Sequence, residues 1–160
     1  PPTAIILPLY FFYGWLNITD TYFAPIVTYL TFNVPLATWL MMGYFDDIPT
    51  TLEEAAYLDG YSALQTLRRV VIPLVYPGII ATIVLCWIFA WNEFLFALLL
   101  TGMRVLPYTR VIPTYVVGMN PDWSIITAAA VIAMIPPAIV VIVLRRYLVR
   151  GLSLGTVRLQ

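Results

Sequence analysis

The feature that most constrains this chain is the length of its apolar segments. Residues 21–45 contain no charged side chain, and Tyr22–Tyr44 is long enough to cross a bilayer as a helix. Apolar segments of similar length cover Pro77–Leu100 and Ile125–Leu144. Charged residues make up 10% of the chain, whereas a soluble domain typically has about 25%. The sequence therefore predicts an all-α membrane protein whose chain crosses the bilayer several times.

Residues 3–16 form a shorter apolar segment. A full span needs about 20 residues, so we interpret this segment as the latter part of a span, and the chain as a C-terminal portion that is truncated at its amino end. Prolines lie inside the apolar segments at Pro8, Pro35 and Pro136-Pro137, and we expect bends at these positions.

The most polar part of the chain, residues 46–73, lies between two apolar segments. Two short helices around a turn are predicted here. Thr50 or Thr51 is expected to cap the first helix, because each is followed three residues later by a glutamate, as in a capping box. These glutamates, Glu53 and Glu54, also suit the positive end of the helix dipole.

A turn at Gly60 is expected to separate the two helices, because glycine adopts positive φ at little steric cost. Ser62 and Gln65 have the spacing of a second capping box. Apolar residues then recur at helical spacing on one face, at Leu64, Leu67 and Val71. Before the turn, Ala55 and Ala56 leave a bare face on which another protein can pack.

The sequence Glu54-Ala55-Ala56, with Gly60 four residues later and Ile72-Pro73 beyond it, resembles the EAA loop of ABC importer permeases. Val70 and Ile72 stand where the family has isoleucine and leucine. The resemblance implies a helical transmembrane bundle of the type I ABC importer permease kind. Residues 1–160 would form a single transmembrane domain, and residues 46–73 its cytoplasmic coupling loop. An ordinary amphipathic hairpin between spans is the alternative. The residues that the resemblance assigns to ATPase coupling are Glu54, Ala55, Ala56, Asp59, Gly60, Ile72 and Pro73.

A second resemblance lies at Trp91-Asn92-Glu93-Phe94, which matches a W-N-[DE]-F signature of carbohydrate-type permeases. A carboxylate inside a span usually faces protein or a water-filled cavity, because hydrocarbon solvates it poorly. Trp91, Asn92 and Glu93 are therefore candidate residues of the translocation pathway. The alternative is that the helix ends early and Glu93 lies at the interface or makes a structural hydrogen bond. The tail Arg150–Val157 also resembles the ending of carbohydrate permeases.

The composition excludes several kinds of site. The chain has no lysine and hence no Walker A sequence, so any ATPase that drives it is expected to be a separate chain. It has no histidine, and its single cysteine, Cys86, lies in an apolar segment, which excludes a disulfide framework. A net charge of zero argues against a nucleic-acid partner. We expect no catalytic residue, no metal and no cofactor.

Together these resemblances imply a permease subunit of an ABC importer for a sugar or oligosaccharide, in the inner membrane of a bacterium or archaeon. The partners implied are ABC ATPase subunits, a second permease subunit, an extracytoplasmic solute-binding protein, the sugar substrate and membrane lipid. An ABC permease for another solute, such as an amino acid or compatible solute, remains an alternative. A secondary transporter and an intramembrane enzyme are less favoured, because no internal repeat and no pair of intramembrane carboxylates is visible.

Arginine distribution predicts the orientation. The loop at residues 101–123 holds Arg104 and Arg110 and is expected to contain a short helix or a re-entrant piece around Tyr108–Val117. On the family resemblance this loop faces the binding protein, and the alternative is that it is only a connector. The coupling loop and the tail hold the six other arginines, so both are expected in the cytoplasm. These six are Arg68, Arg69, Arg145, Arg146, Arg150 and Arg158.

Cysteine labelling tests this orientation. In a Cys86→Ser background, Ser62→Cys and Ser153→Cys should resist a membrane-impermeant thiol reagent in intact cells and react after permeabilisation. Both positions lie on the side richer in arginine, which the positive-inside rule places in the cytoplasm. Ser124→Cys, beside the opposite loop, serves as the externally labelled control. Labelling of position 62 or 153 in intact cells would refute the orientation.

Overall fold

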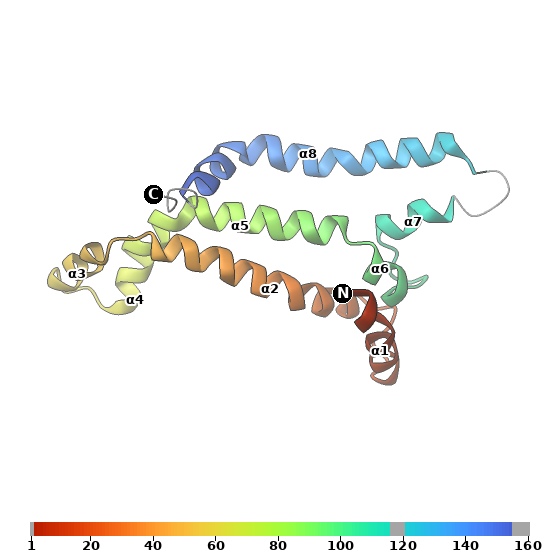
Figure 1. Ribbon diagram of the computed structural model, residues 1–160, viewed down its shortest axis with the longest axis horizontal. Helices are drawn as coiled ribbons and strands as arrows, with labels where there is room; N and C mark the ends of the chain where they lie inside the picture. The colour runs from red at the N-terminus through yellow and green to blue at the C-terminus, as the bar shows by residue number, and fades with distance from the viewer. Residues whose placement is uncertain (1, 116–120, 155–160) are drawn as a thin grey trace. The chain divides into compact units, whose positions relative to one another are not determined.

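The computed structural model describes the backbone of residues 2–115 and 121–154, and side-chain surroundings within residues 4–115 and 121–145. All regular structure in these ranges is helical, which confirms the predicted fold class. In order, the elements are α1 (Pro2–Trp15), α2 (Phe23–Asp46), α3 (Thr50–Leu58), α4 (Ala63–Thr66), the π-helical η1 (Leu67–Val71), α5 (Ile72–Asn92), α6 (Leu95–Leu100), α7 (Tyr108–Thr114) and α8 (Trp123–Leu154) (Figure 1).

Three stretches of the described chain are long and apolar enough to cross a membrane: Phe23–Asp46, Ala63–Asn92 and Trp123–Arg145. The first and last agree with the predicted spans. The predicted short helix around Tyr108 is present as α7. Two predictions concern the carboxyl end and stay untested: the cytoplasmic position of the tail arginines and the resemblance of the tail to carbohydrate permeases. Both fall outside the residues whose surroundings are described, which include neither Arg158 nor the side chains of Arg146 and Arg150.

The chain forms two compact units. One consists of Pro1–Asn33 and Ile88–Ile139, and the other of Val34–Trp87 and Val140–Gln160. Each has its own packing. The first unit holds the helix break that ends α5, and the second holds the hairpin of the predicted coupling loop.

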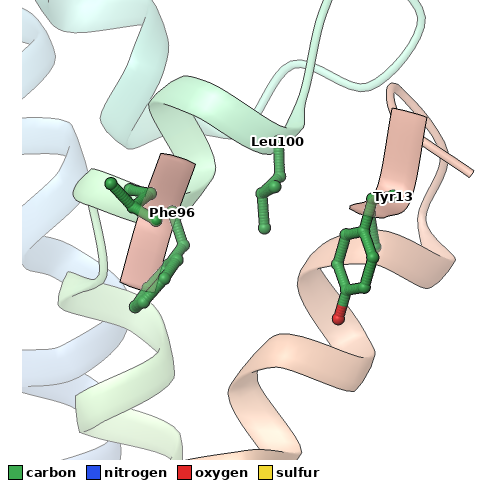
Figure 2. Close-up of a cluster of buried hydrophobic side chains, with 5 residues drawn as sticks. Tyr13, Phe96 and Leu100 are labelled. Atoms are coloured by element: carbon green, nitrogen blue, oxygen red, sulfur yellow. The ribbon is translucent and has the colours of Figure 1, made fainter. Parts of the chain in front are cut away.

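The core of the first unit lies where α1 packs against α6. Its buried members are Ile6, Tyr13, Ala24, Phe96 and Leu100, and Figure 2 shows Tyr13 from α1 with Phe96 and Leu100 from α6. Leu100 is 1% exposed, so the contact between α1 and α6 excludes solvent as a protein core does. The short helix α1 is thus fixed by an apolar contact with α6, which brings the loop before α2 next to the loop after α6.

Asp20 fastens these two loops together. Its carboxylate accepts backbone N–H groups from Gly102 at 2.6 Å, Arg104 at 3.1 Å and Val105 at 3.1 Å. Its own N–H donates to the Leu100 carbonyl at 2.9 Å. Desolvation acts to raise the pKa of Asp20, but the backbone donors outweigh it and lower that pKa below its ordinary value of 3.8. This stabilising contribution is present above pH 3.8 and is lost as the pH falls through the lowered folded-state pKa.

In the second unit, the last turns of α2 pack closely on α5. Gly78 of α5 is buried, and a Cβ added to it would come within 2.5 Å of the Tyr44 ring. Thr82 lies one turn further along, with its hydroxyl 3.5 Å from the Met41 sulfur. Small residues at a helix contact let two spans approach closely, which is the usual way that membrane helices associate.

Gly102→Ala should weaken the hydrogen bonds that the Asp20 carboxylate accepts from the loop after α6. A Cβ at residue 102 would collide with the Asp20 carboxylate, and overpacking of this kind typically costs about 1–3 kcal/mol. We expect a lower thermal unfolding midpoint for the purified protein. Gly43→Ala is the matched control, because a Cβ there meets nothing within 4 Å. Equal unfolding midpoints for the two variants would contradict a stabilising role of the Asp20 hydrogen bonds.

Candidate functional site

The first helix of the predicted coupling loop begins one residue earlier than its capping pattern suggested. Pro49 is the N-cap of α3, with φ −62° and ψ 128°, and no side-chain cap hydrogen bond is present. The predicted caps at Thr50 and Thr51 are therefore wrong. Proline fixes the extended backbone just before the helix, so both threonines already lie in its first turn. Glu53 is in that turn as well, as expected for the helix dipole.

Gly60 ends this helix in the left-handed conformation, with φ +82°, as predicted. Its N–H donates to the Tyr57 carbonyl at 3.0 Å, and the N–H of Tyr61 donates to the Ala56 carbonyl at 3.0 Å. These two bonds are those of a Schellman motif. A Cβ at Gly60 would meet nothing within 4 Å, so the need for glycine comes from its backbone angle and not from crowding.

The second helix starts as predicted but does not end where predicted. Ser62 is its N-cap, and its N–H donates to Gln65 Oε1 at 2.8 Å within a capping box. The helix then continues through η1 and α5 as one stretch, Ala63–Asn92, so it is not the short helix predicted within residues 46–73, and Pro73 and Pro77 lie inside it.

The π-helical turn η1 gives a physical reason for this continuity. Ile72 donates its N–H to the carbonyl of Leu67, five residues back. Pro73 has no N–H, and its ring would crowd the carbonyl of residue 69 in an ordinary α-helix. The wider π turn relieves that conflict directly before the proline.

The same turn alters the face that the second helix buries. Of the predicted stripe, Val71 is 4% exposed, but Leu64 is 56% and Leu67 is 39% exposed. Thr66 and Val71, five residues apart, are buried instead. The sequence spacing places Leu64, Leu67 and Val71 on one face without predicting that this face is buried, and the structure buries Val71 alone among them. A π turn brings residues five apart onto one side, which fits the shared burial of Thr66 and Val71.

Most residues assigned to ATPase coupling are exposed. Ala56 is the exception, at 4% exposed, because it packs inside the hairpin of α3 and α4 seen in Figure 1. The bare alanine face therefore reduces to Ala55. The hairpin also exposes large apolar side chains. We define the hairpin surface by its exposed residues Ala55, Tyr57, Leu58 and Leu64, of which Leu58 is 89% exposed.

The predicted span Pro77–Leu100 is interrupted. Helix α5 ends at Asn92, and α6 begins at Leu95. Glu93 therefore lies in a helix break and not inside a continuous span, as the alternative reading of this segment had it. A break near a membrane leaves unpaired carbonyls at one helix end and unpaired N–H groups at the other, and each needs a partner.

Glu93 supplies partners for the start of α6. Its Oε1 accepts the N–H of Phe96 at 2.9 Å, and its Oε2 accepts the N–H of Ala97 at 3.0 Å. The hydroxyl of Tyr29, from α2, donates to Oε2 at 3.1 Å. Both carboxylate oxygens are thus engaged within the chain, and the negative charge stands at the positive end of a short helix.

Two further signature residues, Asn92 and Trp91, make hydrogen bonds within α5 and to neighbouring segments. Asn92 Nδ2 donates to the Ile88 carbonyl at 2.8 Å. The carbonyl of Trp91 accepts the Tyr108 hydroxyl at 2.8 Å, and the two rings stack with centroids 4.8 Å apart. The indole Nε1 of Trp91 donates to the Ala133 carbonyl of α8 at 3.2 Å. Of these bonds, the one to the Trp91 carbonyl pairs a backbone group at the end of α5, whereas the indole of Trp91 reaches the backbone of α8.

Two cavities flank the stacked pair of Trp91 and Tyr108. One has a volume of about 350 Å³, and its lining includes Tyr22, Tyr29, Trp91, Glu93, Tyr108 and Thr109. The other, of about 410 Å³, is lined by apolar residues of α7 and α8 with the same pair. Tyr29 and Tyr108 were not foreseen from the sequence, because nothing in its pattern marks which tyrosine hydroxyl reaches a residue 64 or 17 positions away.

Glu93→Gln should destabilise the break. An amide keeps one acceptor oxygen but turns an NH₂ group toward backbone N–H groups that need an acceptor, and a buried unsatisfied donor costs about 1–3 kcal/mol. Tyr29→Phe removes only one of the three donors and should cost less. We expect the unfolding midpoint to fall in the order wild type, Tyr29→Phe, Glu93→Gln. A Glu93→Gln protein as stable as the wild type would show that the carboxylate is not needed as a cap.

The comparisons with known proteins agree with this architecture. The family model described as "Binding-protein-dependent transport system inner membrane component" matches residues 1–154. The chain is 38% identical to the probable ABC transporter permease protein y4oR of Sinorhizobium fredii, over 99% of this chain and 57% of that protein. It is 37% identical to the trehalose/maltose transport system permease protein MalG of Thermococcus litoralis, over 91% and 52% respectively.

It is also 32% identical to the osmoprotective compounds uptake permease protein GgtD of Synechocystis sp., over 99% of this chain and 54% of that protein. The chain thus spans about half the length of the curated relatives it matches. Because the family match covers residues 1–154, the chain belongs to the family of inner-membrane components of binding-protein-dependent transport systems.

Proposed function

We propose that this chain belongs to a permease subunit of an ATP-driven importer, and that it helps to form the path of a sugar or oligosaccharide. The family match and the similarity to MalG, a trehalose/maltose permease, support this. The second candidate substrate is a compatible solute, because the chain is also similar to GgtD, an osmoprotective compounds permease. In this proposal the chain catalyses no reaction, and ATP is hydrolysed by another subunit.

Residues 1–160 belong to one transmembrane domain of the inner membrane, and residues 46–73 form its cytoplasmic coupling loop. The partners are two ABC ATPase subunits, a second permease subunit and an extracytoplasmic binding protein that delivers the substrate. The three candidate spans support a site of action in the membrane. The cytoplasmic position of the coupling loop and the carboxyl end rests on the arginine distribution.

The observation that carries the coupling role is the hairpin surface. The hairpin is internally capped by the Schellman motif at Gly60 and the box at Ser62, so it holds its shape without a partner. It nevertheless exposes Leu58 at 89% and Tyr57 at 50%. An amphipathic helix that lays apolar side chains into a groove is a common recognition mode, and an ATPase groove suits this surface.

The second hairpin helix supports a direct mechanical link. Ala63–Asn92 is one continuous helical stretch, so no flexible loop separates the hairpin from the span. A displacement of the docked hairpin therefore acts on the span itself. We assign the cavity lined by Trp91 and Glu93 to the translocation pathway, where the break shapes the wall and Asn92 holds the helix end.

The experiment is uptake into proteoliposomes that hold the complete transporter and its binding protein. Labelled trehalose should enter only with ATP inside, and excess unlabelled compatible solute should not compete. No uptake of labelled trehalose, together with ATP-driven uptake of a labelled compatible solute, would replace the sugar assignment. Uptake driven by an ion gradient without ATP would overturn the importer assignment altogether.

Coupling is tested in the same assay with Ala55→Trp. The new side chain covers the exposed alanine without entering the hairpin, and we expect ATPase co-purification and uptake to fall about tenfold, which corresponds to roughly 1.4 kcal/mol of binding free energy. Thr50→Trp, at an exposed site in the first turn of the same helix, should keep both. Gly60→Val and Glu54→Lys should also weaken docking. Normal ATPase binding and uptake by Ala55→Trp would show that the hairpin surface is not the docking site.

A further inference from the structure

Helix α8 carries a backbone defect at a specific place. In an α-helix the carbonyl of residue i accepts the N–H of residue i+4. The partner of the Ala133 carbonyl would be residue 137, which is proline and has no N–H. This position lies within the candidate span Trp123–Arg145. Hydrocarbon offers no donor to a carbonyl freed there, so it needs one from a neighbouring part of the protein or from water in a cavity.

The donor is the indole of Trp91. Its Nε1 lies 3.2 Å from the Ala133 oxygen, with the donor group on the last turn of α5 and the acceptor on α8. Both residues belong to the same compact unit. The bond therefore replaces, from another helix, the one hydrogen bond that Pro137 removes.

The orientation of the indole is fixed by a second contact. One face of Trp91 stacks on Tyr108, with ring centroids 4.8 Å apart and an interplanar angle of 29°. The Tyr108 hydroxyl donates to the backbone carbonyl of the same tryptophan at 2.8 Å. Tyr108 therefore holds both the ring and the backbone of Trp91, so that its N–H points at α8.

We propose that Trp91 is a positioning residue whose indole N–H stands in for the amide that Pro137 lacks, and so ties the end of α5 to the proline turn of α8. The tie lies between the two cavities that border Trp91. In this role Trp91 does not need to touch a substrate. The proposal implies that the indole N–H is needed only while residue 137 is a proline.

That condition gives a double-mutant cycle with an internal control. Trp91→Phe keeps an aromatic ring against Tyr108 but removes the donor. Pro137→Ala restores the amide that the Ala133 carbonyl would otherwise accept, so it should make the donor redundant. Pro136→Ala restores an amide for Ile132 instead, one residue away, and should leave the need for the indole unchanged. Any loss of packing caused by the smaller ring is common to all three backgrounds and cancels.

The first readout is the thermal unfolding midpoint of the purified complete permease in lipid. Hydrogen bonds between membrane helices contribute about 0.6 kcal/mol on average and up to about 1.7, so Trp91→Phe should lower the corresponding equilibrium constant roughly threefold to twentyfold. We expect Trp91→Phe to cause this full loss of stability in the wild-type and Pro136→Ala backgrounds. In the Pro137→Ala background, the free energy lost on Trp91→Phe should be less than about one third as large. If Trp91→Phe is not recovered from membranes, recovery of the double variants becomes the readout.

The second readout is uptake per permease molecule, and only this arm rests on the proposed function. Trp91→Phe should lower the maximal rate and leave the apparent KM unchanged, and Pro137→Ala should restore the rate whereas Pro136→Ala should not. Trp39→Phe, at a side chain that is 72% exposed on α2, controls for loss of an indole as such. Equal losses in all three backgrounds, or rescue by both proline variants, would overturn the proposal. Absence of uptake by the wild type would refute the function while the stability cycle still decides the tie.

Discussion

Every backbone N–H and C=O group that enters hydrocarbon needs a partner from the protein, and this requirement organises the described structure. Continuous helices meet it by themselves. The chain departs from continuous helix between α5 and α6, and there each signature residue provides or receives a hydrogen bond. Glu93 caps α6, Asn92 covers the Ile88 carbonyl, and Trp91 reaches the carbonyl that Pro137 leaves free. A short polar sequence in an apolar setting is thus explained by the geometry of its backbone before any substrate is considered.

In the loops of the first unit, too, a side chain supplies hydrogen-bond partners to backbone groups. Asp20 gathers three backbone N–H groups from residues 102–105, and the core of α1 and α6 holds the two loops at that distance. Asp20, which looks like an ordinary turn residue in the sequence, thereby fixes the position of the loop that follows α6. The cavity beside Glu93 is partly lined by Val105 and Thr109, so the position of this loop also sets the shape of the cavity.

The fold class and the two spans at Phe23–Asp46 and Trp123–Arg145 follow from the sequence, because a run of apolar residues of sufficient length has few alternatives. Gly60 and the Ser62 box were predictable for a similar reason, since each reflects a local backbone rule. The break at Glu93 and the π turn at η1 were not. The break depends on which distant group satisfies a backbone atom, and Tyr29, Tyr108 and Ala133 carry no mark of that in the sequence. The π turn is a local response to Pro73, but the sequence does not say whether a helix meets a proline with a π turn or by ending. The site roles of the hairpin and of the signature stay proposals.

The π turn has a consequence for how such a chain can change in evolution. A π turn holds one residue more than the α-helical turn it replaces, and each residue of an α-helix advances about 100° around the axis. Because the extra residue is accommodated within a single turn, deleting one residue from Leu67–Val71 would leave an uninterrupted α-helix and keep the hairpin facing nearly the same way relative to the span. A one-residue length change is therefore better tolerated here than elsewhere in the helix, where it would turn the hairpin by about 100°. Chains that dock on the same kind of ATPase groove are thus expected to tolerate a one-residue difference in length at this turn.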